Sequence, residues 1–180
     1  MARTVVALDY AFPWDRLIAR FKFAQAPELA GVLAHTLIGP LAQPLAGHAA
    51  RPDLVLPVPL SPRRLRERGY NQAWELARRL AQALDLPAQP DGLQRWRDTP
   101  AQSTLDAAAR RANLRDAFLI HPRLAKQLAG RHVALVDDVM TTGATLATAA
   151  ELLLRSGACE VSAWVLARTP APSPATSPAR

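Results

Sequence analysis

The stretch His132-Val-Ala-Leu-Val-Asp-Asp-Val-Met-Thr-Thr-Gly-Ala-Thr-Leu146 decides how the rest of this 180-residue chain is interpreted. The apolar run at residues 133–136 predicts a strand buried on both faces, as central strands of parallel sheets are. Two adjacent carboxylates, Asp137 and Asp138, follow, then a short threonine-rich loop, and then the start of a helix. Neighbouring side chains of a strand point to opposite faces. We therefore expect the strand to end before the two acids, so that both reach one ligand.

This order of residues supplies two kinds of hydrogen-bonding group close together. Carboxylates accept hydrogen bonds from sugar hydroxyls, whereas loop amides and a helix N-terminus donate to phosphate. Gly143 permits positive φ and a close approach of the backbone to a ligand. The stretch is not a P-loop, because the GxxxxGK[ST] spacing is absent. The sequence therefore favours a sugar-phosphate site. The alternative is that the acids close a strand and Thr-Thr-Gly caps the next helix.

Strand-like and helix-like segments alternate along the chain, which predicts an α/β fold with a mostly parallel central sheet and helices on both faces. The predicted strands are residues 4–10, 53–58, 94–97, 118–120, 132–136 and 159–166. The predicted helices are residues 15–21, 27–38, 71–84 and 145–155, with a helical turn at 122–128. Residues 1–168 are expected to form one domain. Residues 169–180 hold four prolines among small residues and are expected to be a disordered tail.

Composition limits the function classes. Hydrophobic residues make up 49% of the chain, enough for a proper core. The net charge of +7 and the pI of about 10.9 fit a polyanionic partner. Lysine occurs only at Lys22 and Lys126; the many arginines suit phosphate contacts, or reflect codon composition. The single cysteine, Cys159, excludes intrachain disulfides and cysteine-based zinc sites within this sequence.

A membrane span is not expected, although residues 29–50 carry no charge. Pro40, Pro44, His35 and His48 interrupt this segment and favour a buried helix over 27–38 instead. The N-terminus does not resemble a signal peptide. We therefore expect a cytoplasmic location.

Several blocks of this sequence together resemble one protein family. Residues 132–146 resemble the phosphoribosyl pyrophosphate (PRPP) signature of type I phosphoribosyltransferases. Further stretches resemble the ComF/GntX-like branch of that superfamily, and the resemblance covers about residues 4–168. These stretches are Phe21-Lys22-Phe23; Val58-Pro59-Leu60-Ser61-Pro62-Arg63-Arg64-Leu65-Arg66-Glu67-Arg68-Gly69-Tyr70-Asn71-Gln72; Thr99-Pro-Ala-Gln102-Ser-Thr-Leu105; Arg110-Arg111-Ala-Asn113; and Ala117-Phe118.

The resemblance implies a site for PRPP, with Mg²⁺ as the cofactor. It implies that Asp137 and Asp138 bind the ribose hydroxyls and that the 5-phosphate-binding residues are Thr141, Thr142, Gly143, Ala144 and Thr145. Magnesium would be held mainly through oxygens of the ligand near the two acids, with no direct protein ligand, as its preference for phosphates allows. The implied activity is pentosyl transfer, with pyrophosphate leaving the anomeric carbon through a transition state of oxocarbenium character.

Two further segments have roles implied by the resemblance, each beside a plainer alternative. Arg63 and Arg64 follow the predicted strand at 53–58 and would bind the pyrophosphate; alternatively they belong to a solvated helix face, paired with Glu67 and Glu75. Residues 98–116 would form a lid, with Gln102, Arg110 and Arg111 as its candidate residues. As the alternative, this segment is a long polar connection.

The resemblance has one departure and leaves three functions open. Many relatives carry an N-terminal four-cysteine zinc module, which either lies outside this sequence or is dispensed with here. The first function is a Mg²⁺-dependent phosphoribosyltransferase. The second is a catalytically silent PRPP- or nucleotide-binding accessory protein in DNA uptake and competence. The third is a nucleic-acid-binding module, suggested by the charge. The sequence identifies neither the acceptor, nor a catalytic residue, nor the oligomeric state.

Overall fold

The computed structural model describes residues 2–42, 45–46, 51–96 and 117–170. The candidate lid residues Gln102, Arg110 and Arg111, and positions 171–180 of the expected tail, lie outside these ranges. In chain order the elements are β1 (Arg3–Asp9), α1 (Trp14–Phe23), η1 (Pro27–Leu29), α2 (Ala30–Ala42), β2 (Leu54–Pro57), α3 (Pro62–Arg68), α4 (Gln72–Leu84), β3 (Leu93–Arg95), β4 (Phe118–Ile120), α6 (Pro122–Ala125), β5 (His132–Met140), α7 (Ala144–Arg155) and β6 (Glu160–Arg168).

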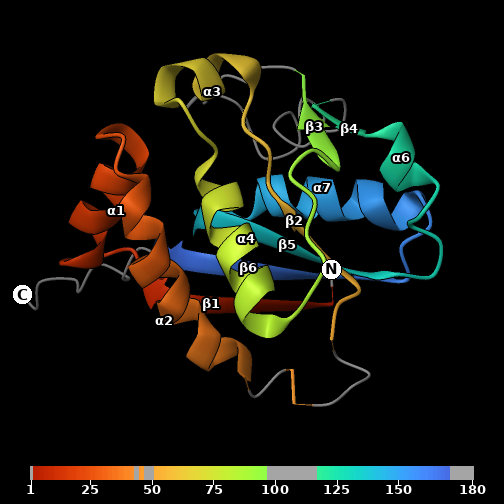
Figure 1. Ribbon diagram of the computed structural model, residues 1–180, viewed down its shortest axis with the longest axis horizontal. Helices are drawn as coiled ribbons and strands as arrows, with labels where there is room; N and C mark the ends of the chain where they lie inside the picture. Colours follow the sequence, from red (N-terminus) through yellow and green to blue (C-terminus); the bar gives the residue numbers. More distant parts are fainter. Residues whose placement is uncertain (1, 43–44, 47–50, 97–116, 171–180) are drawn as a thin grey trace, which may run out of the picture.

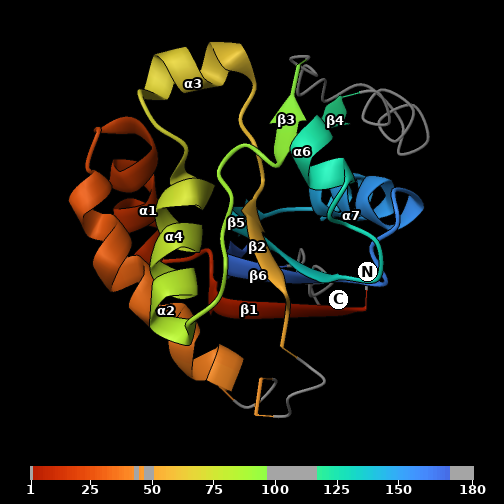
Figure 2. The same cartoon turned by 45° about the vertical axis from the view of Figure 1, so that its right-hand side comes forward.

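A four-stranded sheet forms the centre of the molecule, in the order β1-β6-β5-β2, and every neighbouring pair is parallel. A separate two-stranded antiparallel sheet pairs β3 with β4. Helices α2 and α4 cover one face of the central sheet and α7 covers the other (Figures 1 and 2). The prediction of a mostly parallel α/β fold with helices on both faces is confirmed.

Apolar side chains alternate between the two faces of the sheet along β5, so both faces of the sheet must be covered by helices. Val133 and Leu135 pack into the core beside α7, whereas Ala134 and Val136 pack into the core beneath α2 and α4. All four side chains are fully buried. A strand with apolar residues at consecutive positions is stable only between two apolar layers. The chain order of strands and helices supplies both layers.

Helix α4 shows how the second layer is built. It begins after Asn71, whose side-chain oxygen accepts a hydrogen bond from the Ala73 amide at 3.0 Å. Leu76 and Leu80, one turn apart, are fully buried against the sheet. None of the helices in the described part of the chain is long and apolar enough to cross a membrane. The uncharged segment at 29–50 contributes α2, a helix of 13 residues.

Candidate functional site

Strand β5 continues through the two acids, so the prediction that it ends before them is wrong. Asp137 pairs with Val165 of β6, and further on Met140 pairs with Arg168. The strand was expected to end at Val136 because the apolar run ends there. That run shows which residues are buried, and it does not show how far the strand extends. The pairing persists because β6 runs on to Arg168 beside it. The polar residues therefore belong to a strand that is still hydrogen-bonded on one side.

The neighbouring strand β2 explains how the acids still reach one space. Its register with β5 ends where Pro57 lies opposite Val136. The chain makes one more contact there, since the Val58 amide donates to the Val136 carbonyl at 2.8 Å. Beyond this point β5 has no pairing with β2 on this side. Room is thereby left beside Asp137 and Asp138, at the carboxyl edge where open α/β sheets bind ligands.

A cavity of about 320 Å³ occupies this place and brings both acids together with basic groups. Segments far apart in the sequence form its wall: α1, the loop after β2, α3, the start of α4, β3, and the end of β5 with the loop after it. The lining residues are Lys22, Val58, Pro59, Leu60, Arg64, Arg68, Asn71, Gln72, Ala73, Arg95, Asp137, Asp138, Val139, Thr141 and Thr145.

A small recess of about 40 Å³ adjoins this cavity and contains the predicted phosphate loop. Thr141, Thr142, Gly143, Ala144 and Thr145 all line it, and Asp137, Thr141 and Thr145 line both spaces. Gly143 precedes α7 with φ of +75°, a conformation that residues with a side chain rarely adopt. The first amides of a helix have no acceptor within it. The recess therefore combines the loop backbone with the N-terminus of α7, an arrangement suited to an anion.

The two carboxylates differ in their surroundings. Burial raises the pKa of Asp137 to about 7, and repulsion by Asp138 adds to this shift. The Asp138 backbone amide, which donates to Asp137 Oδ1 at 2.9 Å, and the charges of Lys22 and Arg95 act in the opposite direction. Asp138 is 8% exposed and forms an ion pair with Lys22, whose Nζ lies 3.1 Å from Asp138 Oδ1. The pair of acids thus carries less negative charge near neutral pH than two free aspartates would.

The arginine-rich segment after β2 forms the short helix α3. Ser61 caps it, accepting from the Arg64 amide at 3.4 Å; Pro62 occupies its first turn, and Gly69 ends it at φ of +79°. Arg64 and Arg68, four residues apart, lie in the cavity wall. Arg63 lies outside the wall on an exposed side of the helix, with its Nε 2.8 Å from Glu67 Oε1.

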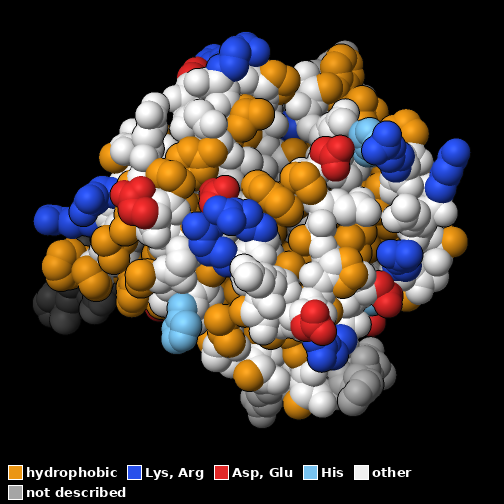
Figure 3. All heavy atoms as spheres, in the orientation of Figure 1, with side chains coloured by type: hydrophobic (Ala, Val, Ile, Leu, Met, Phe, Trp, Pro, Cys, Tyr) orange, Lys and Arg blue, Asp and Glu red, His pale blue; other side chains and the backbone are white. Residues whose placement is uncertain are grey.

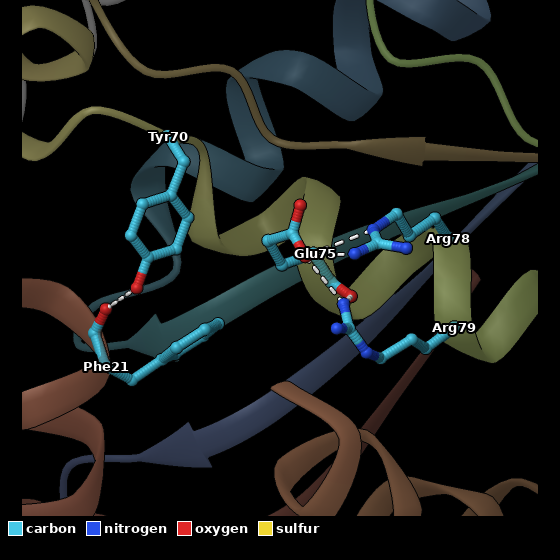
Figure 4. Close-up of polar contacts among 5 residues, drawn as sticks. All are labelled: Phe21, Tyr70, Glu75, Arg78 and Arg79. Atoms are coloured by element: carbon cyan, nitrogen blue, oxygen red, sulfur yellow. Dashed lines mark hydrogen bonds and ion pairs between the residues drawn. The ribbon is translucent and has the colours of Figure 1, made fainter. Parts of the chain in front are cut away.

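The two arginines of the prediction therefore differ in position. Arg64 lines the cavity, so its contact with pyrophosphate stays a prediction, whereas Arg63 lies on a solvated helix face and pairs with Glu67. The other suggested partner, Glu75, instead pairs within α4, with Oε2 at 2.6 Å from both Arg78 Nη2 and Arg79 Nη1 (Figure 4). Burial of Glu75 acts to raise its pKa, but the hydrogen bonds from the two arginines bring the pKa below its usual value.

Five polar residues of the described cavity wall were missed as site residues by the sequence interpretation: Lys22, Arg68, Asn71, Gln72 and Arg95. Asn71 connects two segments of the cavity wall, the loop after β2 and the start of α4. Its Nδ2 donates to the Val58 carbonyl at 3.2 Å, and its Oδ1 caps α4. Lys22 and Asn71 both occur in stretches that resemble the family, which was the available signal. Arg95 lies in a three-residue strand, and no local pattern marks it.

A second cavity, of about 580 Å³, shares Pro59, Leu60, Asn71 and Arg95 with the first. Its wall is mainly apolar and includes Trp74 and Trp96. Of these, Trp96 is 48% exposed. A third tryptophan, Trp164, belongs to the core and is 1% exposed. Trp74 and Trp96, in contrast, line an open space beside the charged cavity.

The chain is similar in sequence to a known domain family and to several known proteins. The phosphoribosyl transferase domain family matches residues 71–176. The DNA utilization protein YhgH of Escherichia coli O157:H7 is 40% identical over 173 residues, which cover 93% of this chain and 72% of that protein. Competence protein F of Haemophilus influenzae is 37% identical over 167 residues, which cover 92% of this chain and 72% of that protein.

Among solved structures, the hypoxanthine phosphoribosyl transferase of Trypanosoma cruzi aligns with a TM-score of 0.51. The alignment covers 81% of this chain and 76% of that one, at 14% identity. At this identity the similarity concerns the fold alone. It agrees with the parallel sheet described above.

Proposed function

This chain belongs to the phosphoribosyl transferase domain family, and on that basis we propose that it binds PRPP together with Mg²⁺. In this proposal the ligand reacts at the ribose anomeric carbon and pyrophosphate is the leaving group. One observation carries the proposal. Asp137 lines both the charged cavity and the recess of the phosphate loop, so a pentose and its 5-phosphate have adjoining places.

Each part of the ligand then has a partner of suitable chemistry. The ribose hydroxyls donate to the carboxylates of Asp137 and Asp138. The 5-phosphate accepts from the backbone of residues 141–145 at the N-terminus of α7. The pyrophosphate lies toward α3, where the guanidinium groups of Arg64 and Arg68 neutralise charge that develops as it leaves.

The donor set fits magnesium held largely through the ligand. Mg²⁺ keeps several waters and binds one or two carboxylates plus substrate phosphates. The described residues contain no cluster of three or more histidine, cysteine or acidic side chains that could hold a metal alone, but Asp137 and Asp138 lie beside the proposed pyrophosphate place. When bound, the ion supplies positive charge to the pyrophosphate and ribose oxygens.

The chain's own contribution is positioning and charge stabilisation. The bond between the anomeric carbon and pyrophosphate breaks, and a bond to an acceptor of unknown identity forms. A transition state with oxocarbenium character requires the sugar to be held while the leaving group separates. The two carboxylates hold the sugar on one side and the arginines receive the pyrophosphate on the other.

Isothermal titration with PRPP and Mg²⁺ tests this proposal. Saturable binding by the wild type, lost in the Asp137→Asn/Asp138→Asn variant, is the expected result. Glu151→Gln is the matched control, since Glu151 is an exposed acid on α7 paired with Arg155. Arg64→Gln should weaken binding, whereas Arg63→Gln should leave it unchanged. Absence of binding by the wild type, or equal binding by the double variant, would refute the proposal.

A second candidate function keeps the ligand and omits the turnover. The names of the two curated relatives, a DNA utilization protein and a competence protein, favour an accessory role in DNA uptake. Pyrophosphate release in the presence of PRPP and a panel of nucleobases and amines separates the two candidates. Steady release supports the transferase, and binding with no release by the panel supports the accessory role.

Direct contact with nucleic acid belongs to the second candidate and rests on the net charge of +7. On the face seen in Figure 3, basic and acidic side chains are intermixed, with hydrophobic groups between them, and the basic groups do not gather in one stripe. DNA affinity that falls steeply with salt would support this contact. Affinity that does not respond to salt would exclude it.

A further inference from the structure

Lys22 reaches the acid pair from the last turn of α1, a helix that belongs to a different part of the chain. The residue before it, Phe21, is fully buried, and the Tyr70 hydroxyl donates a hydrogen bond to the Phe21 carbonyl (Figure 4). The two aromatic rings pack with centroids 5.8 Å apart. Tyr70 lies between α3 and α4, so the end of α1 is fastened to the segment that carries Arg64 and Arg68.

The ammonium group of Lys22 is 3.1 Å from Asp138 Oδ1, and the two side chains are only 15% and 11% exposed. A pair this enclosed differs from a surface ion pair, because breaking it leaves a charge with little access to water. An ammonium has three N–H donors. Lys22 also lines the cavity, so it can hold Asp138 with one donor while it faces the space that a ligand would occupy.

The need for such a cation follows from the charges in the cavity. Two adjacent carboxylates repel each other and repel an anionic sugar phosphate. The arginines of the wall come from α3 and β3, whereas Lys22 comes from α1 and contacts Asp138 directly. Its position allows Lys22 to fix the direction of this carboxylate and to balance its charge.

We propose that Lys22 is the positioning residue of Asp138: it orients that carboxylate toward the ribose hydroxyls and compensates its charge when an anionic ligand enters. This inference rests on the proposed function, because it assumes a PRPP-like ligand in the cavity. Lys22 acts through Asp138 and need not touch the reacting atoms.

Affinity measurements on four variants test the proposal. Lys22→Met keeps the length of the side chain and removes its charge, and it should weaken PRPP·Mg²⁺ binding by about tenfold or more, as expected for loss of a charge-assisted hydrogen bond. Lys22→Arg should restore the affinity to within about threefold, since it replaces the cation. Lys126→Met is the matched control, because Lys126 is the only other lysine and ends α6, outside the cavity wall.

Tyr70→Phe separates positioning from mere anchoring of α1. This variant loses the hydrogen bond to the Phe21 carbonyl but keeps Lys22 and Asp138. We expect its thermal stability to fall while its affinity stays within about threefold of the wild type. Equal losses of affinity in Tyr70→Phe and Lys22→Met would mean that Lys22 only fastens the helix, and would overturn the proposal.

Because the sequence has two lysines, a spectroscopic test can follow the Lys22 side chain directly. Protein labelled with ¹³C-lysine should give two side-chain ε-methylene signals. The Lys22 signal, assigned with the Lys22→Arg variant, should shift in Asp138→Asn and again when PRPP·Mg²⁺ is added to the wild type. The Lys126 signal should shift in neither case. A Lys22 signal that is the same in Asp138→Asn as in the wild type would contradict the pairing.

The outcomes distinguish this inference from the function beneath it. A wild type that binds no PRPP overturns the proposed function, and the role of Lys22 with it. A wild type that binds, together with a folded Lys22→Met variant of equal affinity, overturns only the role of Lys22.

Discussion

Both ends of β5 carry polar groups, but those at the amino end contact other protein groups and those at the carboxyl end line a cavity. At the amino end, His132 Nε2 lies 3.0 Å from Ser162 Oγ and 3.7 Å from Glu160 Oε1, both on β6. The His132 amide donates to the Asp53 carboxylate at 2.8 Å. At the carboxyl end, Asp137 and Asp138 line a cavity of about 320 Å³ beside four basic side chains of its described wall.

The difference lies in the neighbours of the strand. At the amino end, Asp53 next to β2 and two residues of β6 supply partners for the amide and Nε2 of His132, whereas its buried Nδ1 has no hydrogen-bond partner among the described residues. At the carboxyl end β2 has stopped opposite Val136, and the acids face space. Polar groups that pair with the sheet stabilise it, whereas polar groups held beside a cavity are available to a ligand. Changes at the first end should therefore affect stability, and changes at the second should affect binding.

Of the changes at the two ends of β5, Asp138→Asn should have the largest effect on ligand affinity. It removes a charged acceptor for ribose hydroxyls and leaves Lys22 without its anionic partner. We expect affinity for PRPP·Mg²⁺ to fall by at least about a hundredfold, equivalent to about 2.7 kcal/mol. Isothermal titration gives the affinity, and circular dichroism verifies the fold. A loss of less than about threefold would remove Asp138 from the site.

Two glycines with positive φ provide a matched pair: Gly130 precedes the amino end of β5 and Gly143 follows its carboxyl end. Gly143 has φ of +75° and a Cβ there would lie 3.3 Å from Met140 Sδ; Gly130 has φ of +71° and open space around it. Alanine at either position should lower the free energy of unfolding by about 1 kcal/mol. Only Gly143→Ala should also weaken PRPP binding, by about tenfold, because the phosphate loop must shift. Similar affinities for the two variants would contradict this account.

The raised pKa of Asp137 predicts that the stability of the protein depends on pH. Its pKa is raised from 3.8 to about 7 in the folded protein, so the folded state retains a proton that the unfolded state has lost. Stability from this group is present at acid pH and is lost as the pH rises toward 7. Asp137→Asn cannot ionise, so at pH 8 its Tm should exceed that of the wild type by about 2 to 4 °C, even though it binds PRPP less well.

Thermal melts of both proteins between pH 5 and 8 check this prediction. The Tm of the wild type should fall relative to that of Asp137→Asn across the range. Parallel curves for the two proteins would mean that Asp137 does not retain its proton.

Ser162→Ala should have the smallest effect and the opposite character. It removes the hydroxyl beside His132 Nε2, while Glu160 remains 3.7 Å away. We expect the free energy of unfolding to fall by about 0.5 kcal/mol. Urea denaturation measures this loss. Affinity for PRPP·Mg²⁺ should stay the same. A tenfold change in affinity would contradict the account that the amino end of β5 affects stability and only the carboxyl end affects binding.

The sequence predicted the fold well where local pattern decides it. The apolar run at 133–136 was sufficient to predict a central parallel strand, and the spacing of Leu76 and Leu80 predicted α4. The end of β5 was misplaced because strand length depends on β6, which pairs with Asp137 and Met140 from 28 residues away along the chain. Such pairing leaves no mark in the local sequence.

The site was predictable in part. The acids and the loop at 141–145 are contiguous in the chain and were identified together. The direction of each arginine was not predictable, because Arg63 and Arg64 differ only in which side of α3 they occupy. The Lys22–Asp138 contact joins residues 116 positions apart, and only the packing of α1 against the sheet edge creates it.

A crystal structure of the protein with PRPP and Mg²⁺ would test the central claim most directly. The account predicts electron density for the ribose with its hydroxyls within hydrogen-bonding distance of Asp137 and Asp138, and for the 5-phosphate against the backbone of Thr142–Thr145. Density for PRPP elsewhere on the molecule, or a phosphate that avoids this loop while the ribose lies away from both acids, would contradict it.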